Sequence, residues 1–292
     1  MQQLLPDKAL AKTPAPGRAS AIAKSLSLIL WWIMFGRIAY SAAAVATRLG
    51  AAALDLVFPP GCLACRKATA GQGGLCAACW NDMSFIERPF CERLGAPFGR
   101  ELGGAGMISP QAAANPPVFS RARAVAPYES EIARALVNRL KHYDRMELAG
   151  AMGRWMARAG AELLRDADLV VPTPLHRLRL AARRFNQSAA LGAAISRESG
   201  VPIETLALER VKPTAPQVGL TRAQRAANLA GAFRVDETRA GVFAEAHVVL
   251  VDDVLTTGAT ANAAARALLK AGAARVDLLV FARAALGAEL SS

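Results

Sequence analysis

The chain has 292 residues and is 53% apolar, which is enough to bury a sizeable core and excludes a globally disordered protein. This length suits one large domain or two modest ones. The formal net charge of +12 indicates an anionic partner: a phosphate-rich small molecule, a nucleic acid or an anionic membrane surface.

The amino-terminal region carries two competing signals. Residues 1–33 are predicted to be a disordered lead, or an untranslated one, with Met34 as the true start. The uncharged run Ser25–Gly36 is too short for a membrane span, which takes about 20 residues. Ala42–Ala44 resembles a signal-peptide cleavage site, but helical spacing of the apolar residues favours an amphipathic helix over 34–57 that packs on the body.

A cysteine-rich, Gly- and Pro-rich segment follows over residues 58–118. Two C-x-x-C pairs stand ten residues apart, formed by Cys62, Cys65, Cys76 and Cys79. Each pair can place two thiolates on one Zn²⁺, so the four together predict a closed, structural metal site. Free or disulfide-linked cysteines are the alternative interpretation, and a redox site is disfavoured because the context is a loop.

Residues 119–285 alternate helical and strand patterns, and residues 286–292 form a tail. Strands are predicted at Asp168–Pro172, Ala246–Val251 and Arg275–Phe281. Helices are predicted at Glu129–His142, Glu147–Leu164, Gln187–Ser199 and Thr260–Ala271. This alternation predicts a parallel sheet with helices on both faces, which binds ligands at the carboxyl ends of its strands.

The most informative segment is Val248–Thr260. A buried apolar strand ends in two adjacent carboxylates, Asp252 and Asp253, which alternation sends to opposite sides. A turn then leads into a helix amino terminus, a natural phosphate site; it contains Thr256, Thr257, Gly258, Ala259 and Thr260. An ordinary strand–turn–helix with capping residues is the alternative.

Basic residues gather upstream of this motif. Pro172–Gln187 leaves a strand through a proline-rich turn and carries four arginines, whose guanidinium groups suit phosphate. A second basic stretch covers residues 210–228. A solvated basic face is the simpler explanation for any one arginine. The three histidines are scattered, and His247, which opens a buried strand, is expected to be structural.

The strand, the double Asp and the Thr/Gly turn resemble the phosphoribosyl-pyrophosphate motif of type I phosphoribosyltransferases. Together with the Phe58–Cys62 segment, the Leu140-Lys141 step and the Phe185-Asn186-Gln187 run, they resemble the ComF / GntX family of competence-associated proteins. The resemblance implies an α/β phosphoribosyltransferase fold preceded by a small four-cysteine zinc segment.

The same resemblance implies roles for individual residues. Asp252 and Asp253 would contact the ribose hydroxyls, and Arg183 would stabilise the leaving pyrophosphate. Residues that would bind phosphate or the rest of the ligand are Thr256, Thr257, Gly258, Ala259, Thr260, Asn186, Gln187 and Arg225. Arg184 departs from the family, which usually has Gly there, so the pyrophosphate-side loop is less closely defined.

The resemblance also implies cofactors, partners and a process. Mg²⁺ would accompany phosphoribosyl pyrophosphate (PRPP), and one structural zinc is expected, because Cys91 keeps only the first member of a further pair. The expected function is phosphoribosyl transfer linked to DNA uptake, in the cytoplasm and without membrane insertion. The alternative is a non-catalytic factor that binds single-stranded DNA on the same fold.

Overall fold

The computed structural model describes residues 60–98, 106–142, 146–176, 180, 185–212, 224 and 228–285. Contacts divide the chain into two units, Met1–Pro59 and Pro60–Ser292. The predicted lead and the predicted helix over 34–57 therefore lie outside the described residues. No helix in the described ranges is long and apolar enough to cross a membrane.

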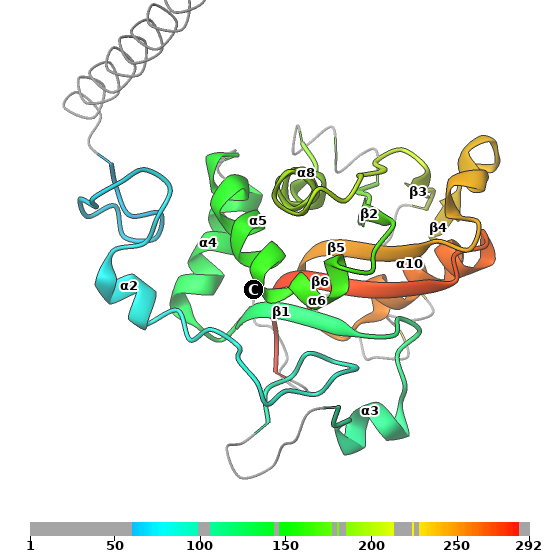
Figure 1. Ribbon diagram of the computed structural model, residues 1–292, viewed down its shortest axis with the longest axis horizontal. Coiled ribbons are helices and arrows are strands. Elements are labelled where there is room, and N and C mark those ends of the chain that lie inside the picture. Colours follow the sequence, from blue (N-terminus) through cyan, green and yellow to red (C-terminus); the bar gives the residue numbers. More distant parts are fainter. Residues whose placement is uncertain are drawn as a thin grey trace, which may run out of the picture. The chain divides into compact units, whose positions relative to one another are not determined.

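The centre of the second unit is a four-stranded, entirely parallel sheet in the order β1-β6-β5-β2 (Figure 1). Its strands are β1 (Ala122–Pro127), β2 (Leu169–Pro172), β5 (His247–Leu255) and β6 (Arg275–Arg283). The central strands are buried on both faces, as expected for parallel strands covered by helices. A small antiparallel hairpin joins β3 (Leu208–Arg210) to β4 (Phe233–Val235).

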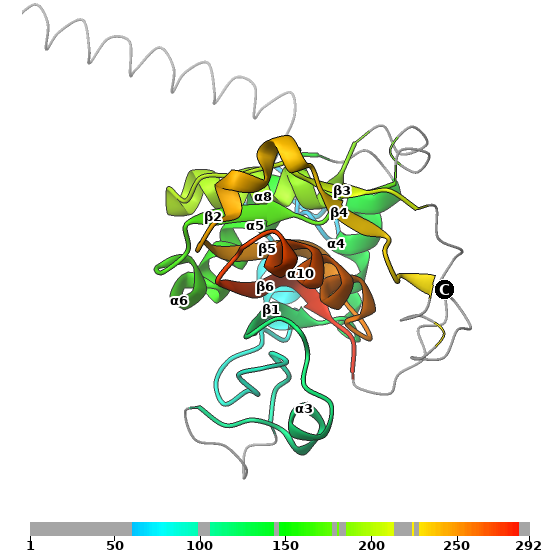
Figure 2. The ribbon, with the colours of Figure 1, turned by 90° about the vertical axis from the view of Figure 1, so that its right-hand side faces the viewer.

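Helices cover both faces of the sheet, as the alternation of elements predicts. One face carries α4 (Glu131–His142), α5 (Glu147–Ala159) and α8 (Gln187–Ser199). The other carries α10 (Ala259–Lys270) and the β3–β4 hairpin (Figures 1 and 2). Two apolar cores result, one on each side, and they share the alternating side chains of β5 and β6.

Most predicted elements are confirmed, with informative differences. The predicted helix over Glu147–Leu164 is interrupted at Gly160, which separates α5 from α6 (Ala161–Leu164). A Cβ at Gly160 would lie 2.8 Å from Leu279 Cδ1, so its absence lets the chain pass close to β6. Strand β1 was not predicted, because its Ala-rich sequence has low strand propensity and is held by burial and by pairing with β6.

The described residues 60–98 and 106–118 form irregular structure with two short helices, α2 (Ala77–Asn81) and α3 (Pro110–Ala114). Aromatic side chains join this segment to the sheet domain: the rings of Trp80 and Trp155 lie 6.1 Å apart, and Trp155 lies 6.3 Å from Phe281. One further short element, the 3-10 helix η1 (Glu237–Phe243), precedes β5.

Candidate functional site

The acid pair lies at the carboxyl end of β5, where the parallel sheet places ligands. Asp252 Oδ1 accepts hydrogen bonds from Ser188 Oγ (3.0 Å) and from the Asp253 amide (2.9 Å). Burial, reinforced by the neighbouring Asp253 carboxylate, raises the pKa of Asp252 to about 7. The site therefore holds an acid that is easily protonated near neutral pH.

The second acid has a different partner. Lys141, in the last turn of α4, places Nζ 3.0 Å from Asp253 Oδ2, and less than a quarter of either side chain is exposed. Burial by itself would lower the pKa of Lys141, but the Asp253 carboxylate outweighs it and the pKa is raised. The two carboxylates thus have separate environments: one is paired with a cation, and the other accepts a hydroxyl hydrogen bond.

The residues after β5 form the predicted phosphate turn. Gly258 has φ +77°, a left-handed conformation that favours glycine, and it directly precedes the first residue of α10. Thr257 Oγ1 lies 3.5 Å from the Ala259 amide nitrogen. The first amides of α10 have no earlier turn of helix to bond to, so they and the helix dipole favour an anion at this end.

The predicted pyrophosphate-side loop leaves β2 and returns at α8, and Asn186 ties these two ends together. Its Nδ2 donates to the Thr173 carbonyl (3.1 Å), while its Oδ1 accepts from the Ser188 amide and caps α8. Next to it, Thr173 Oγ1 and Gln187 Nε2 are buried without a partner among the described residues. Such groups are costly unless something binds them, which fits a polar ligand at this edge.

Several predicted residues lie outside the described ranges. Arg183, Arg225 and Arg184 are among them, so their roles stay predictions. The described site brings together Asp252, Asp253, the turn at residues 256–260 and the Asn186-Gln187 pair. Sequence reasoning gave no role to Ser188. Lys141 entered the sequence analysis only through the family resemblance. It lies about 110 positions before the motif, so its pairing with Asp253 is visible only in the folded chain.

The opposite, amino-terminal edge of the sheet holds a buried charge network. His247 Nε2 lies 2.9 Å from Asp277 Oδ2, and Arg121 donates to the same carboxylate at 2.6 Å. Burial disfavours the charged Asp277, but these partners outweigh it and lower its pKa. His247 is thus held far from the acid pair, in keeping with the structural role expected of it.

The four predicted zinc ligands converge. The sulfur atoms of Cys62, Cys65, Cys76 and Cys79 all lie within 4.8 Å of one another, and those of Cys65 and Cys76 are 3.6 Å apart. Burial alone would raise the pKa of Cys62, but amide hydrogen bonds from Cys65 and Cys76 outweigh it and lower the pKa to about 6. A four-thiol set of this size fits a tetrahedral zinc ion.

A second loop repeats the backbone of the first cysteine knuckle. In the first, the Cys62 amide donates to the Lys67 carbonyl and the Cys62 carbonyl accepts from Arg66. In the second, the Cys91 amide donates to Ala96 and its carbonyl accepts from Gly95, and the Cys91 sulfur accepts from the Ser109 amide (3.2 Å). Leu94 stands where a second cysteine would be, so the second loop keeps the shape with one thiol.

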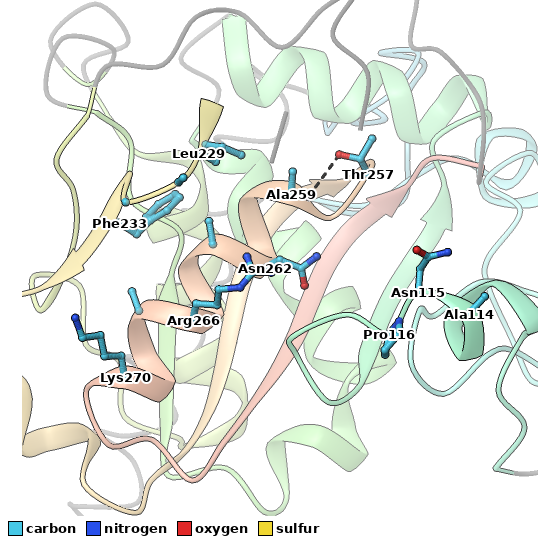
Figure 3. A pocket seen from close by; sticks show the side chains of 14 residues that line it. Ala114, Asn115, Pro116, Leu229, Phe233, Thr257, Ala259, Asn262, Arg266 and Lys270 are labelled. Atoms are coloured by element: carbon cyan, nitrogen blue, oxygen red, sulfur yellow. Dashed lines mark hydrogen bonds between the residues drawn. The ribbon is translucent and has the colours of Figure 1, made fainter. Parts of the chain in front are cut away.

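A cavity of about 770 Å³ lies along the outer side of α10 (Figure 3). It begins at Thr257 and Ala259 in the phosphate turn and extends past Arg266 to Lys270. Asn115 and Pro116 border it on one side, and Leu229 and Phe233 on the other. Neither acid of the pair lines it, so it is a separate space that shares the turn.

Comparison with known proteins agrees with this geometry. A model of the double zinc ribbon domain matches residues 53–111, and a model of the phosphoribosyl transferase domain matches residues 186–291. "DNA utilization protein YhgH" of Escherichia coli (strain K12) is 31% identical over 234 residues, which are 78% of this chain and 99% of that protein. "Competence protein F" of Haemophilus influenzae is 27% identical over 229 residues, covering 76% and 96%.

Among solved structures, glutamine PRPP amidotransferase from B. subtilis, complexed with ADP and GMP, is 22% identical over 44% of this chain and 25% of that one, with a TM-score of 0.31. With this TM-score, the structural similarity adds nothing to the two domain matches. The parallel sheet, the acid pair, the phosphate turn and the four-cysteine cluster define a phosphoribosyltransferase-type protein with a zinc ribbon. The chain belongs to the ComF family, which includes the relatives named DNA utilization protein YhgH and Competence protein F.

Proposed function

We propose that the chain binds PRPP together with Mg²⁺ at the carboxyl edge of its sheet and transfers the phosphoribosyl group. The observation that carries this proposal is the order of groups at that edge. The paired carboxylates Asp252 and Asp253 are followed directly by the Gly258 turn and the amino terminus of α10. Vicinal hydroxyls and a 5′-phosphate need these two features side by side.

Each described group has a task in this proposal. Within the described chain, Asp252 accepts its hydrogen bonds through Oδ1, so Oδ2 is available to a ribose hydroxyl. Lys141 keeps Asp253 oriented and offsets its charge. Backbone amides at 257–260 would hold the 5′-phosphate, while Thr173 and Gln187 would face the pyrophosphate side, together with Arg183 and Arg225.

The reaction breaks the bond between ribose C1 and a pyrophosphate oxygen and forms a bond from C1 to an acceptor nucleophile. Pyrophosphate leaves with the bonding electrons. Charge develops on both fragments, so fixed dipoles and cations in the site are the main source of catalysis. Mg²⁺ would neutralise the pyrophosphate, and carboxylate oxygens of the acid pair are ligands that it accepts.

Calorimetric titration of PRPP with Mg²⁺ tests the proposal. Micromolar binding by the wild type and none by the D252N/D253N variant would support it. Circular dichroism and zinc content should be equal in both proteins, so that loss of binding is not loss of fold. Absence of binding by folded, zinc-loaded wild type would refute it.

A second candidate function is the handling of single-stranded DNA. The names of the curated relatives, DNA utilization protein and competence protein F, favour it, and so does the net charge of +12. A nucleic acid would bind with strong salt dependence, and binding would survive D252N. We place both activities in the cytoplasm.

A further inference from the structure

The cavity along α10 carries two cationic side chains, and none of its described lining residues is a carboxylate. Arg266 and Lys270 project from successive turns of the helix, and both side chains are exposed. A third cation, Lys212, lies at the rim, where its Nζ donates to the Ala230 carbonyl (3.0 Å). None of the three forms an ion pair within the described part of the chain, so their charge is available to a ligand.

The cavity along α10, called the α10 groove from here on, is continuous with the phosphate turn. Thr257 and Ala259 belong to both, and α10 leads from the turn toward Arg266 and then Lys270 (Figure 3). Arg266 and Lys270 are one helical turn apart, about 6 Å along the axis. A ligand whose negative charge repeats along its length would use the turn and both side chains, whereas a single phosphate would need only one of these positions.

Uncharged residues form the walls of the groove. Pro116 and Asn115 on one side and Leu229 and Phe233 on the other flank the cations. Phe233 is 7% exposed and the guanidinium of Arg210 lies 5.5 Å from its ring centroid, so the ring is covered and does not offer a platform for bases. Contacts would thus go to the backbone phosphates and carry little sequence preference.

We propose that the α10 groove binds the phosphodiester backbone of single-stranded nucleic acid, with one phosphate in the turn at residues 257–260 and the neighbouring ones on Arg266 and Lys270. This inference rests on the DNA-handling candidate above and gives it a site. The proposed groove site does not require PRPP to be a substrate. A bound nucleic-acid strand and PRPP would nevertheless both occupy the turn at residues 257–260.

The test is fluorescence anisotropy with a labelled oligothymidylate of about 20 nucleotides, at several salt concentrations. The R266E/K270E variant is compared with R158E/R165E, an equal charge change on the opposite face of the sheet, where Arg158 in α5 and Arg165 directly after α6 are both exposed. We expect the α10 variant to bind at least ~10-fold more weakly, with a salt slope smaller by about 1.4, and the control to stay within ~2-fold of the wild type.

Further measurements separate this inference from the PRPP proposal. Mg²⁺–PRPP titration of R266E/K270E should match the wild type, while excess PRPP should displace the oligonucleotide from the wild type. If R266E/K270E and R158E/R165E lose the same affinity for the oligonucleotide, the attraction is diffuse and the proposed groove site is refuted. Equal affinity of the wild type and both variants would refute it too. If the wild type binds the oligonucleotide through α10 and does not bind PRPP, the groove site is supported and the transferase proposal is refuted.

Discussion

Lys141 Nζ and Asp253 Oδ2 lie 3.0 Å apart, which joins the last turn of α4 to the carboxyl end of β5. The pair is mostly buried, so it should contribute more than a surface ion pair. Within the described residues it also leaves the neighbouring Asp252, whose pKa burial raises to about 7, without a salt bridge of its own.

Replacement of Lys141 by Met should destabilise the protein, because Asp253 is then mostly buried without its cation and lies beside a second carboxyl. We expect a loss of about 2 kcal/mol in the free energy of unfolding, between the values for exposed and buried pairs. The raised pKa of Lys141 means that the contribution of its charge is fully present below its ordinary pKa and is lost as the pH rises through the higher pKa of the folded state.

Urea denaturation at neutral pH measures this loss, and Lys141→Arg should recover most of it. The matched control is Arg234→Met, which breaks the 3.3 Å pair with Glu209 between two well-exposed side chains. That change should cost less than ~1 kcal/mol. Equal effects at the two sites would contradict a special role for the Lys141–Asp253 pair.

Asp252→Asn should make the protein more stable while abolishing PRPP binding. The folded-state pKa of about 7 lies above the ordinary aspartate value, so ionisation of Asp252 costs stability as the pH rises from about 4 to 7, and the cost levels off above that. Asn keeps an acceptor for Ser188. We expect a gain of a few kcal/mol at pH 8 that shrinks toward pH 4.

Unfolding curves at several pH values check this prediction, with the exposed Glu198→Gln change in α8 as the control that should show no such trend. A site that sacrifices stability for ligand binding gives this pattern. An Asp252→Asn protein that is less stable at every pH would show that the carboxylate is a structural group.

Sequence patterns located those parts of the fold that are determined locally. Helix α8 begins and ends where predicted, because Asn186 caps its amino end and Gly200 ends it in a left-handed conformation. The pattern of β5, the turn and α10 is similarly local. The Lys141–Asp253 pair and strand β1 depend on contacts between distant segments, so no local pattern reveals them.

The second cysteine loop gives a prediction about metal content. A zinc ion needs more than the single thiol of Cys91, so the protein should hold one zinc per chain although the matching family model is a double zinc ribbon. Elemental analysis should give a ratio near one. Cys65→Ser should lower it sharply and destabilise the ribbon, while Cys91→Ser should leave the zinc content unchanged. A ratio of two would contradict the assignment.

The phosphate turn can be tested with two glycines that share one backbone conformation. Gly258 and Gly200 both have φ +77°, and a Cβ would meet no close contact at either. Alanine at each should therefore cost a similar ~1 kcal/mol through backbone strain alone. Only Gly258 adjoins the amides that we assign to the 5′-phosphate, so Gly258→Ala should also weaken Mg²⁺–PRPP binding several-fold.

Thermal unfolding and calorimetric titration of the two variants separate strain from ligand contact. Gly200 ends α8 at its carboxyl terminus, away from the Asn186–Ser188 end that faces the site, so Gly200→Ala should bind PRPP as the wild type does. If the two variants lose stability equally and both keep full affinity, the turn is only a structural connection between β5 and α10. If Gly258→Ala alone loses affinity, the left-handed turn is required for phosphate binding, because the matched variant carries the same strain.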